Sequence, residues 1–151
     1  MRSLFRRKAF FTQPQTDKIV AAIKEAEKQT SGEVRLFVES RCRFVDPMDR
    51  AAEIFWSLKM DKTDQRNAVL VYIAIKDKQL AVMGDEGIHR KVGEEFWKQT
   101  VAKMLSHFKT ESYVEGLVHA VNDIGEALQS HFPYDKNTDK NELPDDIVFG
   151  K

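Results

Sequence analysis

The sequence predicts an α/β protein, a three-layer α/β/α sandwich built around a small mixed central sheet. Three observations indicate this class. A segment with helical periodicity separates two strand-like segments, and such a crossover makes the two strands parallel. The second of these strands is followed by a tight turn and a third strand, which must return antiparallel. Two further helical segments follow, so helices are available to cover both faces of the sheet.

The first helix is predicted over residues 14–29 and the first strand over 33–39. Thr12 is a candidate N-cap, and Gln15 three residues later completes the pattern of a capping box. Apolar residues then fall on one helical face, at Ile19, Ile23 and Ala26. After the break at "TSG", apolar residues alternate in the manner of a strand, at Val34, Leu36 and Val38.

The middle of the sequence predicts a second helix over 47–60 and then a hairpin. Asp46 is a candidate N-cap, and Pro47 stands at the first helical position. The run "AVLVYIAI" over 68–75 is continuously apolar, as expected for a central strand buried on both faces. The turn "KDK" then leads into "QLAVM" over 79–83, which we predict to be the second arm of the hairpin.

Two helices complete the predicted domain, over 93–108 and 111–132, because apolar residues recur there at helical spacing. Beyond them the chain becomes polar and poor in apolar residues. We therefore expect an N-terminal extension over 1–13, a single domain over 14–132 and a polar, mobile C-terminal tail over 133–151.

The composition of the chain argues against several classes of protein. The chain has 151 residues, and Lys plus Arg equals Asp plus Glu at 24 each, so the formal net charge is zero. That balance gives no electrostatic reason to expect nucleic acid or an anionic membrane as a partner. Cys42 is the only cysteine, which excludes an intramolecular disulfide. No apolar run approaches the roughly 20 residues of a membrane helix. We expect a cytoplasmic monomer.

Carboxylates gather where the predicted topology brings three segments to one edge of the sheet. These are "TSGE" (30–33), the loop "MDKTDQRN" (60–67) and the glycine turn "GDEG" (84–87). They carry Glu33, Asp61, Asp64, Asp85 and Glu86. Clustered carboxylates repel one another unless a cation neutralises them or their pKa values rise. Hard oxygen ligands suit Ca²⁺, Mg²⁺ or Mn²⁺. We therefore predict a divalent metal site, with the glycines bending the backbone so that a carbonyl can also bind.

Three stretches resemble the TPM-domain family, whose best-known plant members lie in the thylakoid lumen and are linked to photosystem repair. They are "TSGEVRLFV", "DQRNAVLVYIAIKDKQLAVMGDEGIH" and "ESYVEGLVHAVNDIGEAL". The family has a Thr-x-x-Glu before a strand, then Asp-Asn-Gly, two strands and a Gly-x-Gly turn, and a Tyr and a Gly opening the last helix. The similarity covers about residues 15–132. It implies an α/β/α sandwich, divalent metal at loops on one sheet edge, and a phosphatase activity proposed for some members.

The sequence departs from the family pattern inside the expected site. The Asp-Asn-Gly motif reads "DQRNA" over 64–68, and the Gly-x-Gly turn reads "GDEG" over 84–87, one residue longer. These changes imply a site geometry that differs from that of relatives. Many relatives also carry a signal peptide and a C-terminal membrane helix, and neither is recognisable here. The resemblance is therefore to a stand-alone, intracellular version.

Other interpretations of the polar residues stay open. The acids of the three loops could be ordinary surface charges. A second acidic set, at the opposite sheet edge, is a reserve metal site: Glu39, Asp46, Asp49 and Asp77. Cys42 between two arginines favours a thiolate, but no arginine stands six residues later as in cysteine phosphatases. His89 lies beside the acidic turn and could donate a proton. Nucleotide binding is disfavoured, because the turn is acidic and lacks the Gly-x-Gly-x-x-Gly spacing.

Two classes of function follow from these residues. The first is a binding module with a regulatory role or a protein partner, whose loops are ordered by Ca²⁺ or Mg²⁺. The second is a metal-dependent phosphatase acting on phosphomonoesters. Phosphoryl transfer usually needs a nucleophile, a general acid or an arginine clamp at fixed positions. Only Arg66 and His89 stand nearby, and no motif fixes either. The sequence therefore favours the first class.

Overall fold

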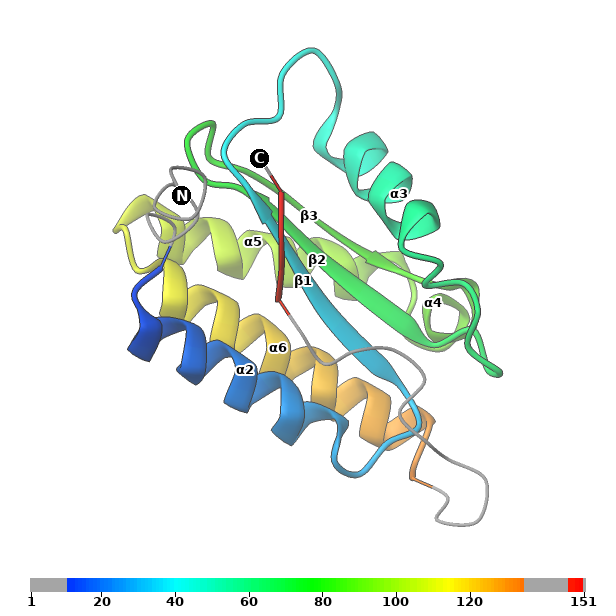
Figure 1. Cartoon of the computed structure of the whole chain (residues 1–151). Coiled ribbons are helices and arrows are strands. Elements are labelled where there is room, and N and C mark those ends of the chain that lie inside the picture. Colours follow the sequence, from blue (N-terminus) through cyan, green and yellow to red (C-terminus); the bar gives the residue numbers. More distant parts are fainter. Residues whose placement is uncertain (1–10, 135–146, 151) are drawn as a thin grey trace.

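The computed structural model describes residues 11–134 and 147–150, and these form an α/β/α sandwich (Figure 1). The central sheet has the strand order β3-β2-β1-β4. Its strands are β1 (Glu33–Glu39), β2 (Ala68–Ala74), β3 (Gln79–Gly84) and β4 (Ile147–Phe149). β1 runs parallel to both β2 and β4, while β3 runs antiparallel to β2. The predicted parallel crossover and the predicted hairpin are both confirmed.

Helices cover both faces of the sheet, unequally. They are α2 (Gln13–Glu27), α3 (Pro47–Ser57), α4 (Glu86–Val92), α5 (Glu94–Lys109) and α6 (Tyr113–His131). α3 lies on one face, and α2, α5 and α6 form the layer on the other (Figure 1). The fold class predicted from the sequence is confirmed.

The alternation of side chains along each strand produces two cores. Val34, Leu36 and Val38 of β1 join the larger core with α2, α5 and α6. The other face of the sheet forms the smaller core, in which Tyr72 of β2 packs near Phe55 of α3. Every residue of β2 is buried, as its continuously apolar sequence predicted.

Capping residues mark the starts of α2 and α3, as the sequence predicted. The Thr12 hydroxyl accepts a hydrogen bond from the Gln15 amide, and the Gln15 side chain accepts one from the Thr12 amide, which completes a capping box. The Asp46 carboxylate accepts a hydrogen bond from the Met48 amide at the start of α3. The helix begins at Pro47, so the chain enters α3 at the predicted residue.

The structure adds two elements that the sequence analysis did not identify. Residues 86–92, of which the sequence analysis interpreted the first two as part of a glycine turn, form the helix α4. Residues 147–149, assigned to a mobile tail, form β4 and pair with residues 36–38 of β1. Residues 1–10 of the predicted N-terminal extension and most of the predicted tail lie outside the described residues, and α2 begins at Gln13, within the predicted extension.

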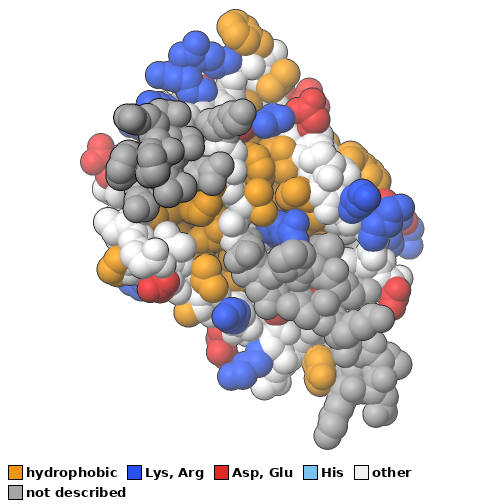
Figure 2. Space-filling view, in the orientation of Figure 1, with side chains coloured by type: hydrophobic (Ala, Val, Ile, Leu, Met, Phe, Trp, Pro, Cys, Tyr) orange, Lys and Arg blue, Asp and Glu red, His pale blue; other side chains and the backbone are white. Residues whose placement is uncertain are grey.

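Charges on the face shown in Figure 2 are mixed in sign. Lys and Arg side chains alternate with Asp and Glu around a central area of hydrophobic side chains (Figure 2). This distribution matches the equal numbers of acidic and basic residues in the sequence.

Candidate functional site

The three predicted loop segments meet at one edge of the sheet. The amide of Glu33 donates a hydrogen bond to the carbonyl of Asn67, with an N–O distance of 3.4 Å. The amide of Asp85 donates to the carbonyl of Ala68 at 2.9 Å. Main-chain hydrogen bonds therefore join the start of β1, the loop 60–67 and the β3–α4 junction, as the topology predicted.

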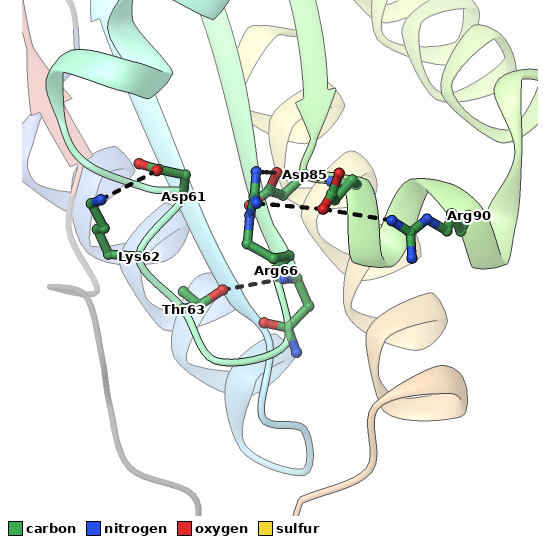
Figure 3. Close-up of polar contacts among 8 residues, drawn as sticks. Asp61, Lys62, Thr63, Arg66, Asp85 and Arg90 are labelled. Carbon is green, nitrogen blue, oxygen red and sulfur yellow. Dashed lines mark hydrogen bonds and ion pairs between the residues drawn. The ribbon is translucent and has the colours of Figure 1, made fainter.

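Polar side chains fix the loop 60–67 against the segment before β1. The side-chain amides of Gln65 and Asn67 both donate to the hydroxyl of Ser31, at 3.0 and 3.1 Å. The Thr63 hydroxyl accepts a hydrogen bond from the Asn67 amide at 3.2 Å. Arg66 lies between these anchors with φ at +52°, in the left-handed region that non-glycine residues seldom adopt. The loop is thus held in a shape that directs the Arg66 side chain toward Asp85 (Figure 3).

Gly87 lets α4 approach this loop closely. A Cβ atom at position 87 would lie 2.1 Å from the carbonyl oxygen of Gln65 and 2.6 Å from that of Arg66. The Gly87 amide instead donates to the Arg66 carbonyl at 2.8 Å. The second glycine of "GDEG" is therefore required for the approach of two backbone segments.

Asp85 and Arg66 form a paired contact at the centre of the edge (Figure 3). Arg66 Nε donates to Asp85 Oδ2 at 2.7 Å, and Arg66 Nη2 donates to Asp85 Oδ1 at 2.9 Å. The same Oδ1 also accepts the amide of Glu86 at 2.8 Å, so Asp85 is the N-cap of α4. Only 4% of the Asp85 side chain is exposed, against 36% for Arg66. Both carboxylate oxygens are thus occupied by donors.

Arg66 also carries charge contacts with the neighbouring acids. Its Nη1 lies 3.4 Å from Glu86 Oε2, which in turn lies 3.5 Å from Nη2 of Arg90. The hydrogen bonds that Arg66 donates to Asp85 raise the pKa of its guanidinium, and the charges of Asp85, Glu86 and Asp61 raise it further. The guanidinium therefore balances part of the negative charge of this edge, alongside Arg90 and Lys62.

The remaining acids of the predicted site have other surroundings. The Asp61 carboxylate points toward Lys62, with 3.7 Å between Nζ and Oδ2, and away from Arg66 (Figure 3). Asp64 is exposed on the loop, whereas Glu33 is 3% exposed at the start of β1. Among the described residues, no group of three or more His, Cys, Asp or Glu side chains is arranged to hold a metal ion. Metal binding by the five acids therefore stays a prediction.

The residues fit a divalent cation in chemistry but not in their present arrangement. Carboxylates are hard ligands for Ca²⁺ and Mg²⁺, and Asn67 Oδ1 is a buried oxygen without a hydrogen-bond partner among the described residues. Asp85, however, already accepts both hydrogen bonds of the Arg66 fork. A metal ion could use Asp85 only if Arg66 moved away.

The reserve acidic set at the opposite sheet edge is divided among separate structural contacts. Asp77 pairs with Arg41 at 2.9 Å and accepts the Cys42 amide at 2.8 Å. Asp46 caps α3, and Asp49 lies in the first turn of the same helix.

Glu39, the buried member of that set, has two partners of its own. Arg50 donates to both carboxylate oxygens, at 2.9 and 3.0 Å, and the Tyr72 hydroxyl donates to Oε2. Burial raises the pKa of the Tyr72 phenol, and the bond to Glu39 raises it further. The bond to Glu39 also raises the pKa of Arg50. The sequence did contain a signal for this contact, because Tyr72 stands inside an apolar strand and a buried phenol needs a hydrogen-bond partner.

Two other candidate residues have ordinary partners. The half-buried Cys42 thiol lies 3.5 Å from the carbonyl oxygen of Val45. The His89 Nδ1 atom accepts a hydrogen bond from the indole Nε1 of Trp97 at 2.9 Å. In the neutral imidazole the proton must then lie on Nε2.

None of the helices in the described ranges has both the length and the apolar character needed to cross a bilayer.

Comparisons with known proteins agree with this fold. The BA42 protein of the psychrophilic bacterium Bizionia argentinensis, solved by NMR, has a TM-score of 0.85 and 40% sequence identity, over 93% of this chain and 96% of that one. The N-terminal domain of cg2496 from Corynebacterium glutamicum has a TM-score of 0.65 at 11% identity, over 89% of this chain and 83% of that one, which shows a shared fold. None of the curated proteins matches the sequence.

The sequence pattern of the TPM domain matches residues 5–127, which include β1, β2, β3 and the junction of Asp85 with Arg66. The chain therefore belongs to the TPM-domain family.

Proposed function

We propose that this chain is a binding module with a regulatory or partner-binding role, in which Ca²⁺ or Mg²⁺ competes with Arg66 for the carboxylates of the loop edge. The observation that carries the proposal is the bidentate contact of Arg66 with Asp85, beside Glu86 and within the field of Asp61. An acidic edge that needs one positive charge can accept it from the chain or from solution.

The exposure of the two partners supports exchange. Asp85 is fixed as the N-cap of α4, while the Arg66 side chain is 36% exposed and can turn toward solvent. Glu86 is 53% exposed and already shares its charge between Arg66 and Arg90. The ligands that we propose for such a cation, once Arg66 is displaced, are Asp61, Asp64, Asp85, Glu86 and Glu33. A bound ion would supply positive charge and bridge the loop 60–67 to the start of α4.

A metal-dependent phosphatase is the less favoured function. Arg66, the candidate clamp for a phosphoryl group, is held by Asp85, and the Nδ1 atom of His89 is held by Trp97. Neither residue is therefore prepared for phosphoryl transfer as the described residues lie. We expect turnover of p-nitrophenyl phosphate with Mg²⁺ to stay below about 1 per second, near the low end for enzymes. A faster, metal-dependent reaction that Asp64→Ala abolishes would favour the phosphatase instead.

Melting temperatures measured with Ca²⁺, Mg²⁺ or EDTA test the binding module. A ligand that binds only the folded state stabilises it by roughly 2.7 kcal/mol at a hundredfold excess over Kd. Added Ca²⁺ should raise the melting temperature of the natural chain, and raise that of Arg66→Gln more, because the internal competitor is gone. The double variant Asp64→Ala with Asp85→Ala should gain nothing. Amide shifts should be confined to residues 60–67 and 84–90.

Arg90→Gln is the matched control. It removes one positive charge beside Glu86, with a side chain that is 73% exposed, and leaves the Arg66–Asp85 contact in place. Its gain from Ca²⁺ should therefore exceed that of the natural chain only slightly, because Arg90 competes at the exposed Glu86 and not at Asp85, and should stay well below that of Arg66→Gln. An equal gain for Arg66→Gln and Arg90→Gln would contradict competition at Asp85, and a gain in the double variant would move the ligands elsewhere.

A further inference from the structure

Two histidines face each other across the helical layer, on helices that carry none of the loop-edge acids. His107 lies near the end of α5 and His119 in the first half of α6, and their ring centroids are 5.1 Å apart with an interplanar angle of 27°. One turn further along the same two helices, Lys103 Nζ lies 3.3 Å from Asp123 Oδ2. Residue numbers rise on one helix as they fall on the other, so α5 and α6 are antiparallel and place His107 opposite His119 (Figure 1).

The main chain around His107 is fixed before any ligand binds. The His107 carbonyl accepts hydrogen bonds from the amides of Thr110 and Ser112, at 3.1 and 2.9 Å, in the turn that leads into α6. Gly116 lets the two helices approach closely at this level, because a Cβ there would lie 2.8 Å from the Cβ of His107. The two imidazoles therefore project from backbones whose separation is set by the fold.

Both rings keep their nitrogen atoms available. Within the described ranges, neither imidazole has a hydrogen bond or an ion pair. By contrast, the Nδ1 atom of His89 accepts the indole N–H of Trp97. His107 is half-buried and His119 is exposed, so an ion from solution can reach them. Because a neutral imidazole has one nitrogen that can accept, the pair presents two uncommitted nitrogen donors to a metal.

The spacing of the two rings suits a shared metal ion. Imidazole nitrogen binds Zn²⁺ at about 2.0–2.1 Å, and this ion prefers a tetrahedral arrangement of ligands. Two imidazoles on one such ion have ring centres about 5 Å apart, which is close to the 5.1 Å observed. Rotation about χ2, which is broad for histidine, would turn both lone pairs from the stacked arrangement toward one ion.

We propose that His107 and His119 form a binding site for a transition-metal ion of the Zn²⁺ class. Imidazole suits Zn²⁺, Cu²⁺ and Ni²⁺, whereas Ca²⁺ and Mg²⁺ select oxygen ligands. No group of three or more His, Cys, Asp or Glu in the described part of the chain is arranged for a metal, so water would supply the remaining ligands. A bound ion would tie α5 to α6 and stabilise the folded chain. The site shares no residue with the loop edge, and it goes beyond the proposed function.

Zn²⁺ titrations followed by NMR, with Ca²⁺ in excess throughout, test the proposal. Ca²⁺ prefers oxygen ligands, so it competes at the loop edge and leaves the imidazoles free. Zn²⁺ should shift the ring signals of His107 and His119 together, with one shared dissociation constant, and should leave residues 60–67 and 84–90 unchanged. Zn²⁺ should also raise the melting temperature, because it binds only the folded pair.

His107→Gln and His119→Gln are the test variants, and His131→Gln is the matched control. His131 is also an exposed histidine of α6, but it does not stack on a second histidine in the described residues. Each test variant should weaken Zn²⁺ binding at least about tenfold, and the control should leave it unchanged. Equal melting temperatures in EDTA would show that all three variants fold.

Cu²⁺ provides a second measurement on the natural chain, because it binds nitrogen ligands more tightly than Zn²⁺ does. One equivalent of Cu²⁺ should give an electron paramagnetic resonance spectrum with two coordinated nitrogens. His119→Gln should reduce that number to one, and His131→Gln should leave it at two.

Several results would overturn the proposal. They are no Zn²⁺ binding at submillimolar concentration, equal weakening in the control variant, a single coordinated nitrogen in the natural chain, or Zn²⁺ shifts confined to residues 60–67 and 84–90. A dimer that Zn²⁺ induces, detected by light scattering, would show that the two ligands come from different copies of the chain and would also overturn it.

Discussion

Both ends of the sheet carry an arginine that grips a buried carboxylate with two hydrogen bonds, yet the two contacts differ in what they join. At one end Arg66 binds Asp85, at 2.7 and 2.9 Å, and connects a loop to the start of α4. At the other end Arg50 binds Glu39, at 2.9 and 3.0 Å, and connects α3 to β1. The geometry is nearly the same, so geometry alone does not decide the role of either pair.

The surroundings of each carboxylate make the difference. Glu39 receives a third donor, the hydroxyl of the fully buried Tyr72, in a core that α3 covers. Asp85 receives its third donor from the amide of Glu86, at a helix end beside solvent. The two carboxylates are similarly buried, with 7% of the Glu39 side chain and 4% of the Asp85 side chain exposed, so the contacts differ in the third donor and in the segments that they join. On this difference we base the expectation that Glu39 serves stability, and the proposal that Asp85 can exchange its cation.

The largest expected effect is that of Glu39→Ala. It leaves the Arg50 guanidinium without its buried partner and the Tyr72 hydroxyl without an acceptor, and breaking a buried pair in this way costs about 3–5 kcal/mol. The free energy of unfolding from urea titration measures the loss. Asp85→Ala should cost less, because Arg66 can turn toward solvent. Equal losses in the two variants would contradict the division between core and surface contacts.

Gly87→Ala should have an intermediate effect. The added methyl group would lie 2.1 Å from the Gln65 carbonyl oxygen, which is a backbone atom and cannot rotate away. Overpacking of this kind typically costs about 1–3 kcal/mol. Hydrogen exchange should increase in 60–67 and 84–90 and stay unchanged around Arg50. Uniformly faster exchange over both edges would show that the edges are coupled.

The smallest expected effect is a pH dependence confined to the Glu39 edge. Burial and Glu39 hold the pKa of folded Tyr72 above the value of about 10 for an unfolded tyrosine. The stabilisation is therefore complete below pH 10 and is lost as the pH rises above 10, where only the unfolded phenol ionises. One proton corresponds to a slope of at most about 1.4 kcal/mol per pH unit. Urea titrations of the natural chain and of Tyr72→Phe should differ by this slope, and parallel curves would contradict it.

Much of the fold could be predicted because local patterns and topology rules agree. The parallel β1–β2 pair, the hairpin and the starts of α2 and α3 follow from alternation, periodicity and capping residues. The convergence of three loops at one edge follows from the topology, and main-chain hydrogen bonds confirm it.

The missing elements have weak local signals. α4 has seven residues and contains a glycine, so its sequence resembles a turn. It depends on the Asp85 cap and on contact with the loop before β2. β4 has three residues, and its partner, β1, lies far away in sequence. Neither element has a pattern of its own that outweighs the ordinary interpretation of a turn or a tail.

The convergence of the three acidic segments was predicted, but the pairing of their side chains was not. Acids at converging loops required a positive charge, and the sequence analysis expected that charge to come from solution. The structure shows Arg66 in contact with Asp85 and Glu86. Side-chain direction and the φ of +52° at Arg66 decide which basic side chain reaches a given carboxylate. The sequence pattern specifies neither of them.

The attachment of Arg66 to the chain also has a consequence for thermodynamic linkage. A tethered guanidinium competes at an effective concentration that dilution cannot change, of millimolar order for short flexible tethers. In the proposed exchange, an ion from solution would have to exceed that concentration, weighted by the two affinities, before it occupied Asp85. The loop 60–67, which tethers Arg66, would therefore set the ion concentration at which the loop edge becomes occupied. A change in the length or stiffness of residues 60–67 would shift that concentration without altering any of the proposed ligands.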